Sequence, residues 1–218
     1  MTIFNRFTWA IEMCKKFEQV GLEVIIIDNA STFAPCVEWL KNCSYKVEKR
    51  EKNEGPWVFE TSELKDKYKD QFFYLADSDF DLSIVPNDFP DHLMRGLETC
   101  DDKTIWKCGL SCELNDLDDN AFTRQVIAHE NNFWINKNSA GYWIAWVDIG
   151  VTLHDRNKKD HWYSALRSDR PYTCRHLDWY HKKENIRPED IYFWEHTKDY
   201  YGWGQKWYNE IYLGNTPR

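Results

Sequence analysis

The segment Phe72-Phe73-Tyr74-Leu75-Ala76-Asp77-Ser78-Asp79-Phe80-Asp81 joins an apolar run to three carboxylates at alternating positions. The apolar run predicts a buried strand, and residues two apart in an extended chain share a face and lie roughly 6.7 Å apart. Asp77 and Asp79 are therefore expected to lean toward one divalent cation, and their oxygen ligands suit Mg²⁺ or Mn²⁺. The alternative is a strand that runs into a solvated acidic loop, and the short motif by itself leaves both interpretations open.

Composition and charge limit the classes of protein. The chain has 218 residues, 42% of them hydrophobic, which is enough for one substantial domain. A net charge of -8 without an evident basic patch argues against nucleic acid or an anionic membrane as a partner. No apolar run approaches the roughly 20 residues that a membrane span needs. An acidic protein that binds a phosphorylated substrate needs positive charge between the two, and a divalent ion held by aspartates supplies it.

The seven cysteines form an odd, scattered set, and the start of the chain carries no basic-then-apolar signal segment. This pattern predicts reduced thiols in a cytoplasm-like compartment. Cys108-x3-Cys112 lacks a second Cys or His pair at finger spacing, so it does not predict a zinc site. The acidic run 115–120 lacks the glycine and the terminal glutamate of a calcium loop and is interpreted as a solvated loop.

The first half alternates helices and strands. Helical apolar spacing runs from Phe7 to Gly21, strands are expected at 22–27, 45–47 and 72–76, and helices at Pro35 and at about 57–67. This alternation predicts an α/β fold with a mainly parallel central sheet flanked by helices. The second half offers strand candidates at 105–108, 133–135 and 142–147, a helix from Pro188 and a last helix at 206–213. We expect a single domain over residues 1–213, with halves at about 1–100 and 101–213, and a tail at 214–218 that starts a linker to further domains.

Three polar turns follow strands of the first half, namely Asp28 onward, Asn53 to Gly55, and Asp77 to Asp79. Ligands of parallel α/β sheets bind beyond the carboxyl ends of the strands, so these turns are expected to line one edge. The glycine-rich dinucleotide motif and the phosphate-loop motif are both absent.

The ordered segments Ile26-Ile27-Asp28-Asn29-Ala30-Ser31, Asn53-x-Gly55 and Asp77-Ser78-Asp79 resemble those of GT-A glycosyltransferases of the family 2 type. The resemblance covers roughly residues 1–85, although Met1 to Phe4 is short for the family's first strand. It implies a GT-A fold, a UDP-sugar donor and Mn²⁺ (or Mg²⁺). The aromatic-rich second half is similar to a glycosyltransferase domain at the amino end of a multidomain protein of large algal viruses, which implies glycan synthesis in the host cytoplasm.

The resemblance also implies roles for individual residues. Asp28 would accept the uracil N3-H, and Asp79 would be the direct metal ligand. Residues expected to help hold the nucleotide are Asn5, Arg6, Asn53, Gly55, Trp57, Asp77 and Ser78, with Asp77 on the ribose or on a metal-bound water. The alternatives are a turn-stabilising Asp28, an exposed Arg6 in the first turn and a core Trp57.

In the second half, the resemblance implies an acceptor site. His176 would complete the metal sphere, or else be a hydrogen-bonded structural residue. The base that takes the acceptor's proton is expected to be Asp148, after a buried strand, or Asp178, with Asp155 and Glu195 left open. Tryptophans crowd this half, and we expect only two or three of them to touch substrate: Trp134, Trp143, Trp146, Trp162, Trp179, Trp194, Trp203 and Trp207.

The expected activity is metal-dependent, inverting transfer of a sugar from a UDP-sugar to a glycan or glycoprotein acceptor, with glucose or a 6-deoxyhexose such as rhamnose as cargo. One alternative is a sugar-1-phosphate nucleotidyltransferase, although the glycine-rich basic loop typical of that class is missing. Another is a noncatalytic carbohydrate-binding module, which would account for the tryptophans but not for the ordered turns.

Overall fold

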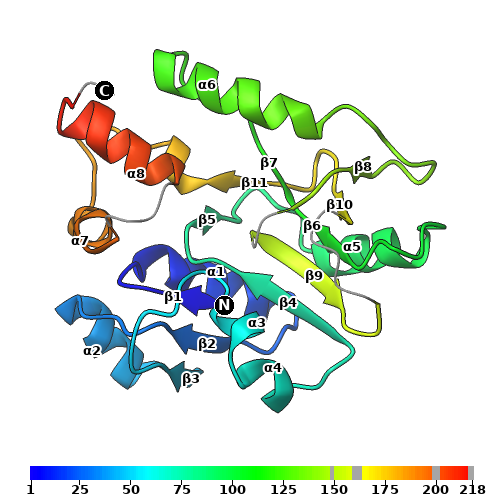
Figure 1. Cartoon of the computed structure of the whole chain (residues 1–218), viewed down its shortest axis with the longest axis horizontal. Coiled ribbons are helices and arrows are strands. Elements are labelled where there is room, and N and C mark those ends of the chain that lie inside the picture. The colour runs from blue at the N-terminus through cyan, green and yellow to red at the C-terminus, as the bar shows by residue number, and fades with distance from the viewer. Residues whose placement is uncertain (148–149, 159–163, 198–201, 216–218) are drawn as a thin grey trace.

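A mixed α/β fold is built on three sheets in the computed structural model, which describes residues 1–147, 150–158, 164–197 and 202–215 (Figure 1). The first sheet is parallel throughout, in the order β1 (Thr2–Ile3), β2 (Ile25–Asp28) and β3 (Lys46–Lys49). Helices α1 (Thr8–Gln19) and α2 (Ala34–Asn42) make the crossovers. Pro35 lies in the first turn of α2, and Gly21 takes a φ of 79° just after α1.

The second sheet has five strands in the order β4-β9-β6-β10-β8. Their bounds are β4 (Phe72–Ala76), β6 (Lys107–Gly109), β8 (Trp143–Ile144), β9 (Val151–Asp155) and β10 (Ala165–Arg167). Among the described residues of this sheet, only β6 and β10 are parallel neighbours, and the other three pairings are antiparallel. The α/β class is confirmed, but strand directions are mixed in place of a mainly parallel sheet. The reason is β9, which lies between β4 and β6 and runs opposite to both, and antiparallel neighbours need no helical crossover.

A small third sheet contains strands from both halves of the chain. Strand β11 (Thr173–His176) pairs antiparallel with β5 (Phe80–Asp81) and parallel with β7 (Ser111–Cys112). The register sets His176 opposite Phe80, and the backbone N-H of Leu177 donates to the carbonyl of Asp79 at 2.9 Å. The acidic segment after β4 is thereby held beside the segment after β11.

The remaining helices surround the sheets (Figure 1). Those described are α3 (Val58–Thr61), α4 (Leu64–Lys67), α5 (Phe89–Glu98), α6 (Ala121–Glu130), α7 (Pro188–His196) and α8 (Trp203–Trp207), with the 3₁₀ helices η1 (Asn131–Phe133) and η2 (Leu177–Trp179) and the π-helix η3 (Tyr208–Tyr212). The expected helix at 57–67 is interrupted between α3 and α4. Residues 133–135 are not the strand we expected, because the chain continues from α6 directly into η1. The acidic run 115–120 ends in Asn120, whose side chain caps α6.

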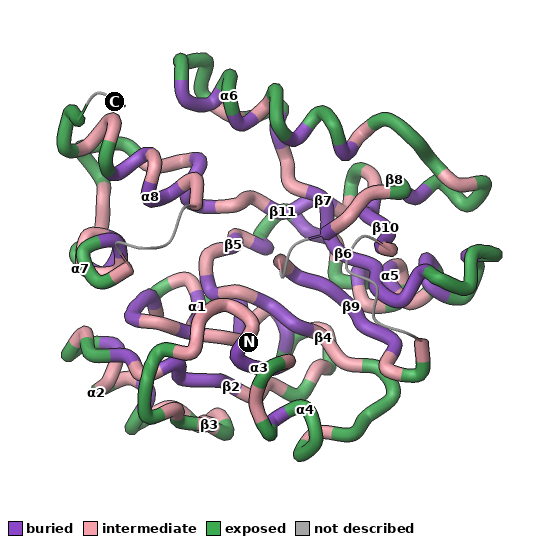
Figure 2. Tube along the Cα trace, in the orientation of Figure 1, coloured by how far each residue is buried: buried purple, intermediate pink, exposed green. Residues whose placement is uncertain are grey.

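Buried residues concentrate on the strands, while the outer surface of α6 is exposed (Figure 2). A separate aromatic cluster lies under α6, α7 and α8 and contains Trp179, Trp194, Trp207 and Tyr208. These tryptophans therefore fill a core. Within the described ranges, no helix has both the length and the apolar character that a membrane span requires.

Candidate functional site

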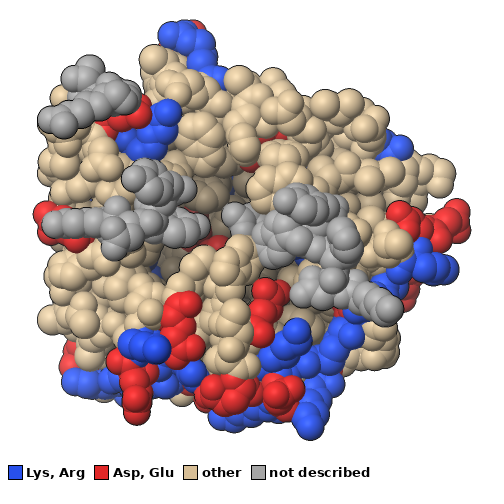
Figure 3. Space-filling view, in the orientation of Figure 1, with Lys and Arg blue, Asp and Glu red and all other residues tan. Residues whose placement is uncertain are grey.

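Two cavities meet at Asp79 and Arg6. The strand-end cavity, of about 460 Å³, lies beyond the strands of the first half and is lined by Thr2, Phe4, Arg6, Asn29, Asn53, Gly55, Pro56, Asp77, Ser78, Asp79, Phe193, His196 and Thr197. The large cavity, of about 1020 Å³, extends into the second half. Among the described residues, four line both cavities: Arg6, Asp77, Asp79 and Phe193. The face drawn in Figure 3 is hollowed near its centre, and most of its charged side chains lie along its lower edge.

One wall of the strand-end cavity is a turn organised by Asn29. Its Nδ2 donates to Oδ1 of Asn53 and to the carbonyl of Gly55, both at 2.9 Å, and its Oδ1 accepts the N-H of Glu54 at 2.9 Å. Gly55 has a φ of 83°, a conformation that favours glycine. The predicted turn Asn53 to Gly55 therefore lines the cavity in a defined shape, and Asn29 is a wall residue that the sequence reasoning missed.

Asp28, Asn5 and Trp57 are not among the described residues that line the two cavities. Asp28 is buried, and its Oδ1 accepts the N-H of Ser31 at 2.8 Å. Asn5 is buried and accepts the N-H groups of Thr32 and Phe33. Trp57 packs on a cluster of apolar side chains that includes Val58, Phe59 and Leu75. The structure therefore gives Asp28 a turn-stabilising contact and gives Asn5 a loop-fastening one.

Arg6 lies at the centre of the site and is only 5% exposed, so it is not the exposed first-turn residue of the alternative interpretation. Its Nη1 donates to Oδ2 of Asp79 at 3.3 Å, its Nε donates to Oδ1 of Asp190 at 3.0 Å, and its Nη2 donates to Oδ1 of Asp178. Burial alone would lower the pKa of Arg6, but the three carboxylates raise it well above its ordinary value. The guanidinium is thus a permanent positive charge between the two cavities.

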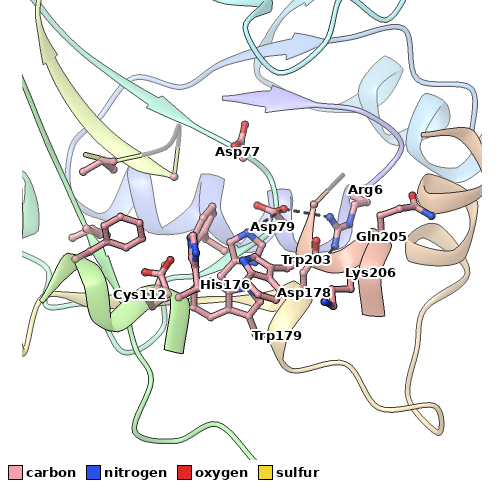
Figure 4. A pocket seen from close by; sticks show the side chains of 18 of the residues that line it. Arg6, Asp77, Asp79, Cys112, His176, Asp178, Trp179, Trp203, Gln205 and Lys206 are labelled. Carbon is pink, nitrogen blue, oxygen red and sulfur yellow. Dashed lines mark hydrogen bonds and ion pairs between the residues drawn. The ribbon is translucent and has the colours of Figure 1, made fainter. Parts of the chain in front are cut away.

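Asp79, His176 and Asp178 form a candidate cation group, because each offers one ligand atom and these atoms lie within 4.8 Å of one another. Oδ1 of Asp79 and Nδ1 of His176 are buried without a hydrogen-bond partner among the described residues. Figure 4 shows Asp79 between His176 and Arg6. Two carboxylates and an imidazole suit Mn²⁺, with Mg²⁺ as the harder alternative.

The charge balance of this region also fits a cation. Asp79, Asp178 and Asp190 face the guanidinium of Arg6, and the Nε of Arg187 lies 3.9 Å from Asp190. Arg187 also lies 3.4 Å from Glu189, so four carboxylates against two guanidinium groups leave negative charge in excess. Burial raises the pKa of Asp79, although His176 and Arg6 partly offset the effect. A bound divalent ion would neutralise the excess and favour the ionised carboxylate.

Asp77 lies outside the cation group and, in Figure 4, points away from Asp79. Strand β4 ends at Ala76, so the alternation of an extended chain no longer sets both carboxylates on one face. The backbone N-H of Asp77 donates to the carbonyl of Gly150 at 3.3 Å, and the residue lines both cavities. Ser78 is buried and lines the strand-end cavity. The third member of the group is instead Asp178.

Of the four carboxylates considered as the catalytic base, the three described ones lie in different surroundings. Burial would raise the pKa of Asp178, but Arg6 and a hydrogen bond with Nε2 of His181 at 3.2 Å hold it well below its ordinary value. Asp148 lies outside the described residues. Val147 and Gly150, the described residues that flank positions 148–149 in the sequence, line the large cavity. Asp155 is buried and accepts the N-H of Asn157, whereas Glu195 is exposed on α7.

Glu189 and Asp190 are site residues that the sequence reasoning missed. The pair follows Pro188 at the start of α7, and acidic residues there are also an ordinary helix-start signal. Asp190 holds Arg6, and the carboxylate of Glu189 accepts the N-H groups of Phe7 and Thr8 and the Oγ1 proton of Thr8. Glu189 therefore caps α1 from a distant part of the chain.

Gly204 allows α8 to close over Asp178. A Cβ at this position would overlap Oδ2 of Asp178 and lie 2.8 Å from Nε1 of Trp194. Only a glycine permits so close an approach without displacing the carboxylate.

Comparison with known proteins adds little. No family model matches the chain, and no curated protein matches it. Among solved structures, the crystal structure of residues 1–349 of S. aureus TarS is similar, with a TM-score of 0.44 and 10% sequence identity. The match covers 81% of this chain and 59% of that one, so this chain spans less than two thirds of the TarS structure. A similarity this low carries no inference about the fold or the activity.

Proposed function

We propose that this protein is a metal-dependent glycosyltransferase that moves a sugar from a nucleotide-diphosphate donor to a glycan acceptor. One observation carries the proposal: the candidate cation group and Arg6 lie where a strand-end cavity meets a larger second cavity. A diphosphate bridging a nucleoside on one side and a sugar on the other needs positive charge at such a junction.

The strand-end cavity is the proposed nucleotide site. Its volume of about 460 Å³ is in the usual range for small-molecule sites, and it combines polar turns with the half-buried ring of Phe4. Asn53 and Gly55 would face the nucleoside, while Ser78 and Asp77 would face the ribose. UDP is proposed as the nucleotide on the resemblance of the sequence to family 2 enzymes.

The diphosphate would lie at Arg6 and the cation group. Asp79, His176 and Asp178 would hold Mn²⁺ or Mg²⁺, whose charge would neutralise the leaving diphosphate. The chain fixes these ligands in advance: His176 stacks on Trp179 with ring centroids 4.9 Å apart, and His181 hydrogen-bonds Asp178. Arg6, anchored by Asp190, keeps its guanidinium at the junction, where it would bind the phosphates directly.

The base that takes the acceptor's proton is proposed to be Asp148, on the sequence argument alone. The lowered pKa of Asp178 and its contact with Arg6 favour a ligand role over a base, because a general base works best with a pKa near the working pH. The resemblance of the sequence to family 2 enzymes extends the proposal in three respects. We propose that transfer inverts the anomeric configuration, that the sugar transferred is glucose or rhamnose, and that the acceptor is a viral glycan.

Calorimetry with UDP, with and without Mn²⁺, tests the proposal, followed by a screen of nucleotide sugars for metal-dependent release of UDP. Tight UDP binding that requires Mn²⁺, together with UDP release from at least one sugar nucleotide, supports the transferase. Formation of pyrophosphate from UTP and a sugar 1-phosphate would indicate a nucleotidyltransferase instead. Sugar binding without any nucleotide binding would indicate a carbohydrate-binding module.

A further inference from the structure

The large cavity contains a second buried charged pair. Arg167, at the end of β10, donates from Nη1 to Oε2 of Glu130 at 2.8 Å, and both residues line the cavity although each is only 5% exposed. Neither side chain has a hydrogen bond or ion pair with Arg6 or Asp79 among the described residues. The pair is therefore a polar feature of the cavity wall distinct from the cation group.

Arg167 is held rigidly in this position. Its Nε donates to the carbonyl of Trp146 at 2.9 Å, and its guanidinium lies 4.2 Å from the ring centroid of Phe133. Within the described part of the chain, the Oε2 atom of Glu130 accepts a hydrogen bond and the Oε1 atom does not. The buried pair thus retains an acceptor oxygen at Glu130 for a ligand's hydroxyl groups while both partners stay paired and fixed.

Aromatic side chains border the charged pair. Trp146 and Trp203 are half-buried and line the same cavity. Edge-to-face contacts fix them: Phe133 lies 5.1 Å from Trp146 and His129 lies 5.7 Å from Trp203, measured between ring centroids. Half-buried, immobilised rings next to fixed polar groups match the two surfaces of a sugar ring, whose C-H face is apolar and whose edge carries hydroxyls.

The charges of this wall cancel. Arg167 neutralises Glu130, and Lys206 lies 3.6 Å from Glu210, which also lines the cavity. Among the described lining residues at this end, no cation is left over for a carboxylate or phosphate group.

We propose that Glu130, Arg167, Trp146 and Trp203 form a binding subsite for a neutral saccharide and that, given the proposed transferase function, this saccharide is the acceptor. Hydroxyl groups bind the Glu130–Arg167 pair, and the C-H face of the sugar packs on a tryptophan. The subsite selects sugars without carboxylate or phosphate groups.

Saturation-transfer NMR on the protein with Mn²⁺ and UDP tests the subsite. The probes are methyl glycosides of glucose, galactose and mannose, with methyl glucuronide and glucose 6-phosphate as the anionic members. Trp203→Ala weakens binding of the neutral glycosides about tenfold through loss of the aromatic contact. Glu130→Gln weakens it by at least about tenfold through loss of a charged acceptor. Trp134→Ala is the matched control, because this half-buried tryptophan packs on Trp143 and Arg170 and is not among the residues lining either cavity.

The outcomes separate this inference from the proposed function. Glycoside signals that depend on Trp203 support the subsite even if UDP fails to bind, and in that case the transferase proposal alone falls. The subsite is overturned if no neutral glycoside gives a signal at tens of millimolar, if the anionic probes bind better, or if Trp203→Ala binds as the parent protein does. Circular dichroism of each variant checks folding, and Trp203→Ala keeps the test valid if Glu130→Gln does not fold.

Discussion

Nη1 of Arg6 lies 3.3 Å from Oδ2 of Asp79, a member of the candidate cation group. The same guanidinium also binds Asp178. Arg6 therefore contacts two of the three side chains that would coordinate a metal ion. A buried guanidinium among carboxylates costs desolvation energy that only its partners offset. Arg6 therefore links the stability of the fold to the charge state of the site.

Replacing Arg6 by Gln should reveal this link. The variant leaves Asp79, Asp178 and Asp190 without their main counter-charge, and we expect the free energy of unfolding to fall by about 3–5 kcal/mol. Mn²⁺ should then raise the melting temperature of Arg6→Gln more than that of the parent protein, as differential scanning calorimetry would show. Arg6→Lys, which keeps the charge but not the fork of donors, should lose less. Equal Mn²⁺ shifts in the parent and in Arg6→Gln would contradict the account.

Asp79 and Asp81 offer a matched pair within one acidic segment. Asp79 belongs to the cation group, whereas Asp81 pairs with Arg175 at 3.0 Å. We expect Asp79→Asn to lower Mn²⁺-dependent UDP binding and transfer by at least about 100-fold. Asp81→Asn should stay within about threefold of the parent, since a partly exposed ion pair contributes little. Calorimetric titration of UDP in the presence of Mn²⁺ measures both variants, and similar losses in the two would count against the assignment.

Glu189 should matter for stability through α1. Its carboxylate receives the first N-H groups of that helix at 3.2–3.3 Å, and its side chain is buried. Glu189→Ala should lower the free energy of unfolding by about 1–2 kcal/mol, the usual cost of a lost helix cap. Glu195→Ala, on the exposed side of the same helix α7, should change it by less than about 0.5 kcal/mol. Urea denaturation compares the two, and a neutral Glu189→Ala would refute the capping role.

His154 should make the fold sensitive to acid. It is 2% exposed between Phe73 and Trp106, and its burial lowers its pKa from 6.5 to about 3, with a smaller contribution from Lys107. Below the unfolded value of 6.5 the unfolded chain takes up a proton that the folded chain does not. Stability is therefore complete above about pH 6.5 and falls toward pH 3, by about 2 kcal/mol at about pH 5.

The His154→Leu variant provides the comparison for this effect. Because it lacks the titrating imidazole, its free energy of unfolding should depend less steeply on pH between about 6.5 and 4. Urea titrations at several pH values measure the slope, and identical slopes for the parent and His154→Leu would rule out the mechanism.

Local pattern was enough to locate strands β2, β3 and β4 of the first half. The apolar run at 72–76 forms β4 with those bounds, and the runs before Asp28 and around Val47 form β2 and β3. The runs at β2 and β4 are recognisable because a continuous apolar stretch between polar turns needs no distant partner to be identified, whereas β3 holds a single apolar residue, Val47. The same pattern was weaker beyond residue 100. Strands β10 and β11 have three and four residues, and β11 ends in Arg175 and His176, so only their pairing partners define them.

The sequence by itself determined that Asp79 follows strand β4 and that the Asn53–Gly55 turn follows strand β3, because apolar runs, glycine and asparagine act over a few residues. Only the tertiary structure decided which distant side chains meet there. Arg6, Asp178 and Asp190 come together across 172 and 184 residues of chain, and Asp28 turns inward to its own loop. These choices depend on packing and on the pairing of buried charges, which neither spacing nor composition encodes locally.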